Sequence, residues 1–165
     1  MAKETKKRKP NVTIEGARII FRNFSGAASD YNRAGDRNFC LVLDEELAEE
    51  LAADGWNVKK KDPREEGDDP LLYLKVKVKF GDFPPVIKQV TSRGATQLDK
   101  DTVMILDTAA IENVDLIITP YEYTVNGKSG VAAYLKKMYV TIAEDDLDKK
   151  YAHFSYEDAE EVPFD

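Results

Sequence analysis

The stretch Leu72-Tyr73-Leu74-Lys75-Val76-Lys77-Val78-Lys79-Phe80 alternates between apolar side chains and lysines or a tyrosine. Successive side chains of a β-strand point to opposite faces, so this alternation predicts a strand with one buried face. The other face carries a row of three lysines, which the strand geometry spaces by roughly 6.5 Å. That spacing is close to the phosphate repeat of an extended single strand of nucleic acid. An ordinary solvated strand face, protected from edge pairing by its lysines, is the alternative interpretation.

Further strand signals lie on both sides of this stretch. Residues 12–24, 38–43, 86–91, 114–125 and 131–142 are rich in β-branched and aromatic side chains. The last two runs are joined by Asn126-Gly127-Lys128-Ser129-Gly130, which is a strong hairpin signal. Residues 25–35 are rich in Gly, Ser, Asp and Asn and are predicted to form a loop.

Helix signals are fewer. Asp44 is a predicted N-cap, Leu47, Ala48 and Leu51 share one helical face, and Gly55 ends the helix. Residues 99–109 are predicted to form a second short helix. Residues 59–70 are charged and contain two prolines, so they are predicted to form an exposed loop.

The order of these elements predicts a mainly β protein. Several strands with turn signals and one or two short helices favour a small barrel like that of the oligonucleotide-binding (OB) fold. A length of 165 residues suits one domain with short tails. We expect a basic disordered leader at 1–10, the OB-like domain at 11–143 and a disordered acidic tail at 144–165.

The formal net charge of −7 is distributed unevenly along the chain. Residues 1–10 carry +4, residues 44–69 carry −7, and residues 144–165 carry −7. The remainder of the chain is therefore at +3. Since the acids are concentrated in two segments, a basic face can exist elsewhere on the domain.

Few residues are suited to catalysis. Cys40 lies in an apolar run, where we expect a small buried side chain, and with no second cysteine it forms no internal disulfide. The single histidine, His153, lies in the tail, so neither a zinc site nor a catalytic triad can be assembled in the domain. A two-metal nuclease built on acids of residues 59–70 remains an alternative. We expect no enzyme activity, no metal and no cofactor.

No apolar stretch reaches the roughly 20 residues that a membrane-spanning helix needs. The basic start, Lys3 to Lys9, is not followed by an apolar segment, so we do not expect it to act as a signal peptide. We therefore expect a cytoplasmic location.

Basic and aromatic side chains recur on several predicted strands and loops. Arginine and lysine contact phosphates and aromatic rings stack on bases, so this mixture favours binding to single-stranded nucleic acid. The expected contacts are Arg18, Arg22, Phe24, Tyr31, Arg33, Arg37, Tyr73, Lys75, Lys77, Lys79, Tyr121, Tyr123, Lys128 and Lys136.

The C-terminal sequence Asp158-Ala159-Glu160-Glu161-Val162-Pro163-Phe164 resembles the acidic tip of bacterial single-stranded-DNA-binding proteins. The resemblance implies that replication and repair proteins dock on this tip, with its Phe in an apolar pocket. The docking residues would be Glu160, Glu161, Val162, Pro163 and Phe164. Here Asp165 follows Phe164, so the terminal carboxylate is displaced by one residue.

The domain also resembles phage single-stranded-DNA-binding proteins with an OB-fold. The similar segments are 19–24 (IIFRNF), 31–39 (YNRAGDRNF), 54–59 (DGWNVK), 114–118 (VDLII) and 134–136 (YLK). This resemblance implies a role in replication or recombination of phage DNA, without a cofactor.

Two expectations follow for the tail and the hairpin. Acids of the tail compete with DNA for the basic face, so deletion of residues 144–165 is expected to tighten DNA binding at low salt. A hairpin such as that of residues 121–139 can extend a sheet between subunits, which would make the protein a homo-oligomer. The remaining alternative is an acidic interaction protein that binds a host protein and no nucleic acid.

Overall fold

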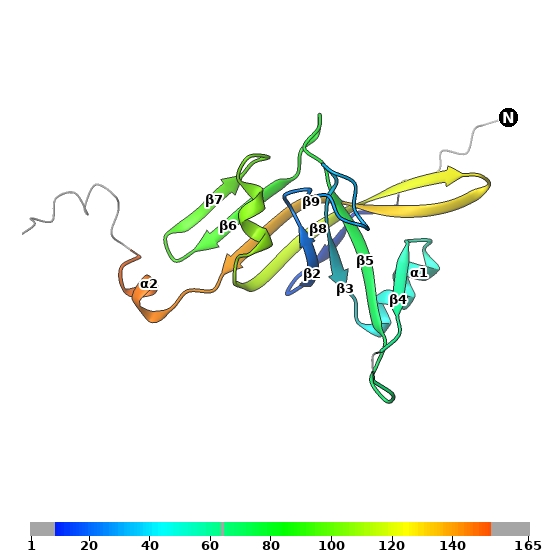
Figure 1. Cartoon of the computed structure of the whole chain (residues 1–165), viewed down its shortest axis with the longest axis horizontal. Coiled ribbons are helices and arrows are strands. Elements are labelled where there is room, and N and C mark those ends of the chain that lie inside the picture. Colours follow the sequence, from blue (N-terminus) through cyan, green and yellow to red (C-terminus); the bar gives the residue numbers. More distant parts are fainter. Residues whose placement is uncertain (1–8, 64, 153–165) are drawn as a thin grey trace, which may run out of the picture.

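The computed structural model describes residues 9–63 and 65–152 (Figure 1). In these ranges the elements are β1 (Val12–Ile14), β2 (Arg18–Asn23), β3 (Arg37–Val42), α1 (Glu45–Ala53), β4 (Val58–Lys61), β5 (Leu71–Val78), β6 (Val86–Thr91), β7 (Gly94–Leu98), the 3-10 helix η1 (Val103–Asp107), β8 (Ile111–Val125), β9 (Lys128–Ile142) and α2 (Asp146–Lys150). The predicted mainly β class with short helices is confirmed.

All the described strands belong to one sheet. Its central path runs β1-β8-β9-β5-β3-β2, while β4 pairs with β5, and β6 pairs with both β7 and β9. The two end strands of the path, β1 and β2, do not pair with each other, so the sheet is not closed into a barrel. The predicted small barrel is therefore wrong, whereas the mainly β class holds. Figure 1 shows the β6–β7 pair and the tip of the β8–β9 hairpin projecting at opposite ends of the molecule.

Strand β5 lies at the centre of the sheet and behaves as its alternation predicts. Leu74, Val76 and Val78 are buried, whereas Lys77 between them is exposed. One edge of β5 pairs with β3 from Tyr73 to Val78. The other edge is divided: its first half pairs with β4, and Val76–Lys77 pair in parallel with β9. Three strands therefore take their positions from this one segment.

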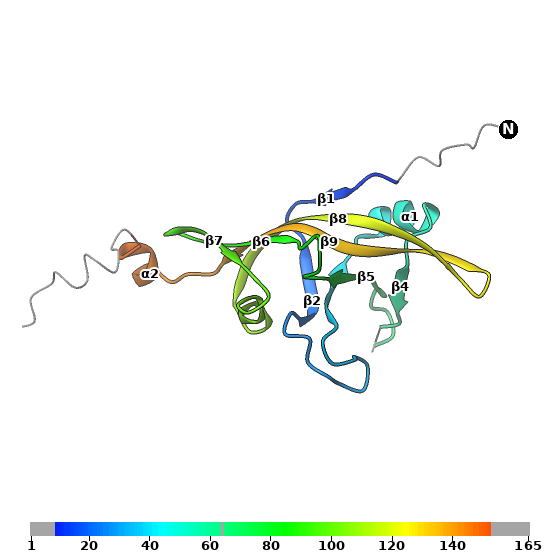
Figure 2. The ribbon, with the colours of Figure 1, turned by 90° about the horizontal axis from the view of Figure 1, so that it is seen from above.

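The β8–β9 hairpin confirms its turn signal and is longer than predicted. Asn126 and Gly127 have φ angles of 52° and 76°. Positive φ at both central residues is the requirement of the type I′ turn, whose twist matches that of the flanking strands. Each strand of the hairpin has 15 residues, and its tip extends beyond the body of the molecule (Figure 2).

The single strand predicted for residues 12–24 is divided into two. Gly16 has a φ of +62°, and its backbone N–H donates to Asp115 Oδ1 at 2.9 Å. The chain turns at this point, so β1 pairs with β8 while β2 pairs with β3. Strand β2 also carries a bulge between Ile20 and Asn23, where Phe21 has a positive φ of 51°.

Of the remaining elements, some were predicted from the sequence and others were not. Asp44 caps α1 by accepting from the Leu47 N–H at 2.7 Å, as predicted. The helix predicted at 99–109 is only the short η1. Residues 58–61, expected mostly in a loop, form β4 by pairing with β5, and β7 and α2 were not predicted. Helix α1 and η1 bury Leu51 and Leu106 in the same core as the apolar side of the sheet.

The start of the predicted acidic tail is held in place. The carboxylate of Glu144 accepts from both the backbone N–H and the hydroxyl of Ser92, each at 2.5 Å. These hydrogen bonds lower the pKa of Glu144 below its usual value. Nearby, an Arg93 Nη donates to the Tyr151 carbonyl at 3.4 Å. The turn between β6 and β7 thus fixes the tail as far as Tyr151; the predicted docking residues 160–164 lie outside the described residues.

None of the described helices has the length and apolar character to cross a membrane.

Candidate nucleic-acid interface

The sheet has one face packed on the core and a second face that carries polar, basic and aromatic side chains. The pairing register decides which side chains share the second face, because directly opposed residues of neighbouring strands point the same way. We call this surface the open face. It consists of Arg18 and Ile20 of β2, Asn38 and Cys40 of β3, Tyr73, Lys75 and Lys77 of β5, Lys59 and Lys61 of β4, Tyr134 of β9 and Tyr121 of β8.

The lysine row of β5 meets two tyrosines of the hairpin. Lys77 and Lys79 each place Nζ 5.8 Å from the ring centroid of Tyr134. Tyr121 lies edge-on to Tyr134, with ring centroids 5.5 Å apart, and is 56% exposed. Ammonium groups and accessible rings are thereby gathered where β5, β9 and β8 adjoin. Tyr134 was not among the expected contacts, although its alternation with Lys136 in the sequence was a signal for it.

Strand β4 adds lysines to the open face. These lysines belong to the segment 59–70, which was predicted to be a loop. Lys59 is the register partner of Tyr73, and Lys61 that of Leu71. Lys61 Nζ lies 5.7 Å from the ring centroid of Phe21, which is 60% exposed. A run of three lysines has no alternation, so its strand character becomes visible only through its pairing with β5.

Cys40 lies on the open face between the strands that carry these cations. The thiol is buried, as expected from its apolar run. Burial raises the pKa of Cys40, while the positive charges of Lys59 and Lys75 act in the opposite direction. The raised pKa keeps the thiol protonated at neutral pH, which suits an inert side chain rather than a nucleophile.

Four of the expected contacts are engaged in holding the fold, and Arg22 and Phe24 are the first two. Arg22 Nη1 donates to the carbonyls of Leu106 and Ala109, each at 2.8 Å, and so closes the end of η1. Phe24 is fully buried and stacks on Phe39 with centroids 5.4 Å apart. The expectation that bases stack on Phe24 is therefore wrong, because its ring has no accessible face.

Arg37 joins two loops. Its Nη1 donates to the Phe24 carbonyl at 2.8 Å, and its guanidinium lies 5.2 Å from the ring centroid of Phe80. Tyr123 is packed as well: its hydroxyl accepts from Asn57 Nδ2 at 2.8 Å. Its ring lies so close to Gly130 that a Cβ there would be 2.8 Å from the ring. Both side chains, Arg37 and Tyr123, therefore hold parts of the fold together.

The other expected contacts are exposed but lie apart from the lysine row. Tyr31 and Arg33 are in the loop between β2 and β3, and Tyr31 is 96% exposed. Lys128 is at the tip of the hairpin arm, and Lys136 is exposed at the bulge of β9. The structure thus brings together Arg18, Tyr73, Lys75, Lys77, Lys79 and Tyr121 and places the remaining exposed residues at the margins.

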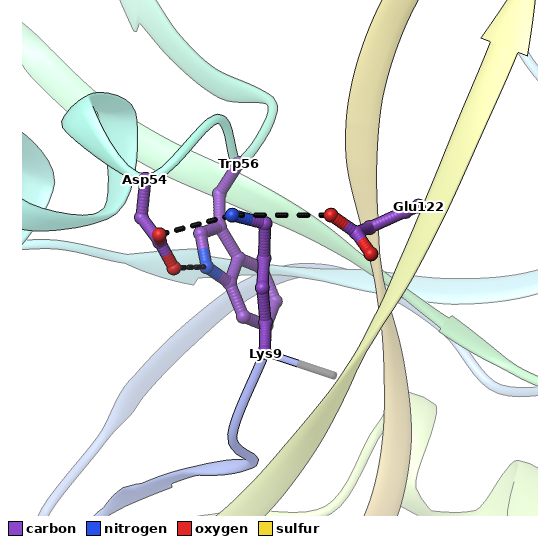
Figure 3. Close-up of polar contacts among 4 residues, drawn as sticks. All are labelled: Lys9, Asp54, Trp56 and Glu122. Atoms are coloured by element: carbon purple, nitrogen blue, oxygen red, sulfur yellow. Dashed lines mark hydrogen bonds and ion pairs between the residues drawn. The ribbon is translucent and has the colours of Figure 1, made fainter. Parts of the chain in front are cut away.

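Two acidic residues lie away from the open face, and Figure 3 shows Lys9 between them. Lys9 Nζ lies 3.0 Å from Asp54 Oδ1 and 3.9 Å from Glu122 Oε1, and Trp56 Nε1 donates to Asp54 Oδ2 at 3.3 Å. The hydrogen bond from Lys9 is the main cause that lowers the pKa of Asp54. Glu122 is the register partner of the buried Val131, so this cluster is not on the open face. Lys9, the one described residue of the basic leader's lysines, thus pairs with the protein's own acids.

Within residues 9–63 and 65–152, no group of three or more His, Cys, Asp or Glu side chains is arranged to hold a metal ion. The geometry of the open face instead combines cations with accessible rings on a sheet. Proteins that bind single-stranded nucleic acid without sequence preference use this combination.

Comparisons with known proteins agree with that class. Residues 1–164 match the family model described as a putative phage ssDNA-binding domain, and the chain belongs to this family. This confirms the resemblance to phage single-stranded-DNA-binding proteins. No match to a curated protein was found.

Solved structures show a similar fold. The single-stranded DNA-binding protein from bacteriophage Enc34 in complex with ssDNA is 8% identical, with a TM-score of 0.52 over 82% of this chain and 88% of that chain. Another structure of the Enc34 protein is 7% identical, with a TM-score of 0.51 over 92% of this chain and 90% of that chain.

The placement of Cys40 between cations can be tested by its titration. Replacing both Lys59 and Lys75 by Met removes positive charge that stabilises the thiolate, so the pKa of Cys40 is expected to rise further. The rate of iodoacetamide alkylation, followed by mass spectrometry across a pH series, will then increase only at higher pH than in the wild type. The paired substitution of Lys149 and Lys150 by Met is the charge-matched control. An unchanged pH profile in the Lys59/Lys75 variant would contradict this placement.

Proposed function

We propose that the protein binds single-stranded DNA across the open face, with little dependence on sequence, during replication of phage DNA. The observation that carries this proposal is the lysine row of β5 beside Tyr134 and Tyr121. Membership of the phage ssDNA-binding family supports DNA as the ligand. The protein acts by binding and protecting DNA, without catalysis or a cofactor, in the cytoplasm of the infected host cell. A role in recombination is part of the same proposal.

The phosphates are bound by the cations of β5. Lys75 and Lys77 lie on one face of a single strand, two residues apart, so their spacing follows an extended sugar-phosphate backbone. Lysine is a flexible point charge and does not require one fixed phosphate geometry. Contacts of this kind carry no sequence information.

The bases are stacked on rings next to the row. Tyr121 is the more exposed tyrosine of the hairpin pair, and Tyr134 supports it edge-on from β9. Stacking on an aromatic side chain contributes about 1–3 kcal/mol per base and accepts any base. Phosphate contacts and stacking together account for binding that tolerates any sequence.

The acidic tail is proposed to recruit replication proteins through residues 160–164. The resemblance of this segment to the tip of bacterial single-stranded-DNA-binding proteins supports the proposal. The anchoring of Glu144 on Ser92 supports it too, because the tail then starts beside the β6–β7 turn and not on the lysine row.

The phosphate role of the row predicts a specific salt dependence. Removing two phosphate contacts from a single-stranded complex lowers the slope of log K against log salt by about 1.4. The K75A/K77A variant is therefore expected to bind labelled oligo-dT at least about fivefold more weakly, with this smaller slope, in anisotropy titrations. K149A/K150A, which removes the same charge from α2, is the matched control.

Two outcomes of these titrations would contradict the open-face model of DNA binding. One is equal affinity of K75A/K77A and wild type for oligo-dT at every salt concentration. The other is wild-type affinity for duplex DNA equal to that for oligo-dT. Absence of any oligonucleotide binding would favour the acidic interaction protein that the net charge also allows.

Competition between the tail and DNA can be tested without disturbing the Glu144 anchor. A chain that ends at Ala152 lacks five acids of the tail and is expected to bind oligo-dT more tightly than wild type at low salt. The difference in affinity should vanish at high salt. Equal affinities at low salt would contradict competition between the tail and DNA. Phe164→Ala keeps the charge of the tail; it should retain wild-type DNA affinity and lose co-purification with the phage replication proteins.

A further inference from the structure

Two aromatic rings at one end of the open face are almost completely exposed. Tyr31 and Phe83 are both 96% exposed. Burial of a Phe side chain typically contributes about 1.5–3 kcal/mol to folding, and Phe83 makes almost none of this contribution. A ring held in solvent at the margin of a binding surface is a candidate ligand contact.

Both rings lie on loops that leave the same end of the β3–β5 pair. Arg37, the first residue of β3, is the register partner of Val78, the last residue of β5. The loop with Tyr31 ends where β3 begins, and the loop with Phe83 starts where β5 ends. The lysine row therefore leads directly from Lys75 toward the two exposed rings.

The roots of both loops are fixed. Phe80 packs against the core and Pro85 is buried, so only the short segment between them projects, and Pro84 stiffens it next to Phe83. In the other loop Asn32 Nδ2 donates to the carbonyls of Ala27 and Asp36, at 2.8 and 2.9 Å. The exposure of the rings is thus a feature of ordered loops.

Arg37 braces the two loops against each other. Its guanidinium donates to the Phe24 carbonyl, at the start of one loop, and lies over the Phe80 ring, at the root of the other. A guanidinium that lies over a ring and at the same time donates a directed hydrogen bond is an arrangement that Lys does not reproduce.

On the basis of the proposed function, we propose that Phe83 and Tyr31 are stacking platforms that hold bases at this end of the DNA strand, with Arg37 as the residue that positions them. The ligand at the rings is a base and not a phosphate, because Asp82 adjoins Phe83 and Asp30 adjoins Tyr31. These carboxylates repel the sugar-phosphate backbone, which stays on the lysine side. We call Phe83, Tyr31 and Arg37 together the clamp. The clamp fixes one end of the DNA strand and hence the direction in which the DNA crosses the sheet.

The test separates stacking from charge. Phe83→Ala is expected to weaken oligo-dT binding about tenfold, corresponding to one lost base stack, with the salt slope unchanged. Phe83→Trp should restore the affinity. Leu147→Ala, which removes an apolar side chain 65% exposed on α2, is the control and should bind like wild type.

The direction of the strand gives a second readout. In wild type, 2-aminopurine placed at only one end of the oligonucleotide, 5′ or 3′, should be quenched by the rings, and the quenching should be lost in Phe83→Ala. Arg37→Lys should weaken the quenching while circular dichroism shows that the fold is retained.

Failure of this inference is distinguishable from failure of the proposed function. If K75A/K77A weakens binding but Phe83→Ala does not, the clamp is overturned and the open-face model stands. If Phe83→Ala changes the sedimentation mass but not DNA affinity, the ring contacts a second copy of the chain and the clamp is again overturned. If wild type binds no oligonucleotide, the proposed function itself fails.

Discussion

The strict alternation of β5 is the constraint on which the rest of the structure depends. Leu74, Val76 and Val78 must be buried, so the lysines between them are forced to the opposite side of the sheet. A slip of one residue would bury lysines and expose the core, so the register of β3, β4 and β9 on β5 is strongly determined. The same physical requirement that builds the core therefore assembles the cations of the open face.

Charge is separated across the molecule in a way that the net charge conceals. The acids of α1 and of the loop after β4 are concentrated in one segment of the chain, residues 44–69. Asp54 and Glu122 form ion pairs with Lys9 away from the open face. Lys59, Lys75 and Lys77 lie together on the open face. An acidic protein can thus present a basic surface, and long-range repulsion of DNA by the remaining acids is screened at physiological salt.

Much of the fold was predictable because its signals are local. The alternation of β5, the Asp44 cap and the Asn126-Gly127 turn each specify their element within a few residues. Strand β4, the division of residues 12–24 and the open sheet depend on pairing between distant segments. Such pairing has no local signal.

The candidate site was predictable in part for the same reason. Alternation placed Lys75 and Lys77 correctly, but the bulge of β2 shifts the alternation after Ile20. Arg22 therefore turns to η1, and Phe21 becomes exposed. Residue type alone suggested DNA contacts for Phe24 and Arg37, which the structure uses in its core and between its loops, and it gave no signal for Phe83.

The central claim is that single-stranded DNA lies on the open face. The most direct measurement is a two-dimensional NMR titration of isotope-labelled protein with oligo-dT. Binding is predicted to shift the amide signals of Asn38, Lys75, Lys77 and Tyr134 together, and to leave those of α1 and the β6–β7 turn unchanged. Shifts concentrated on α1 or on the Lys9–Asp54 side of the sheet, with the β5 signals unmoved, would contradict the account.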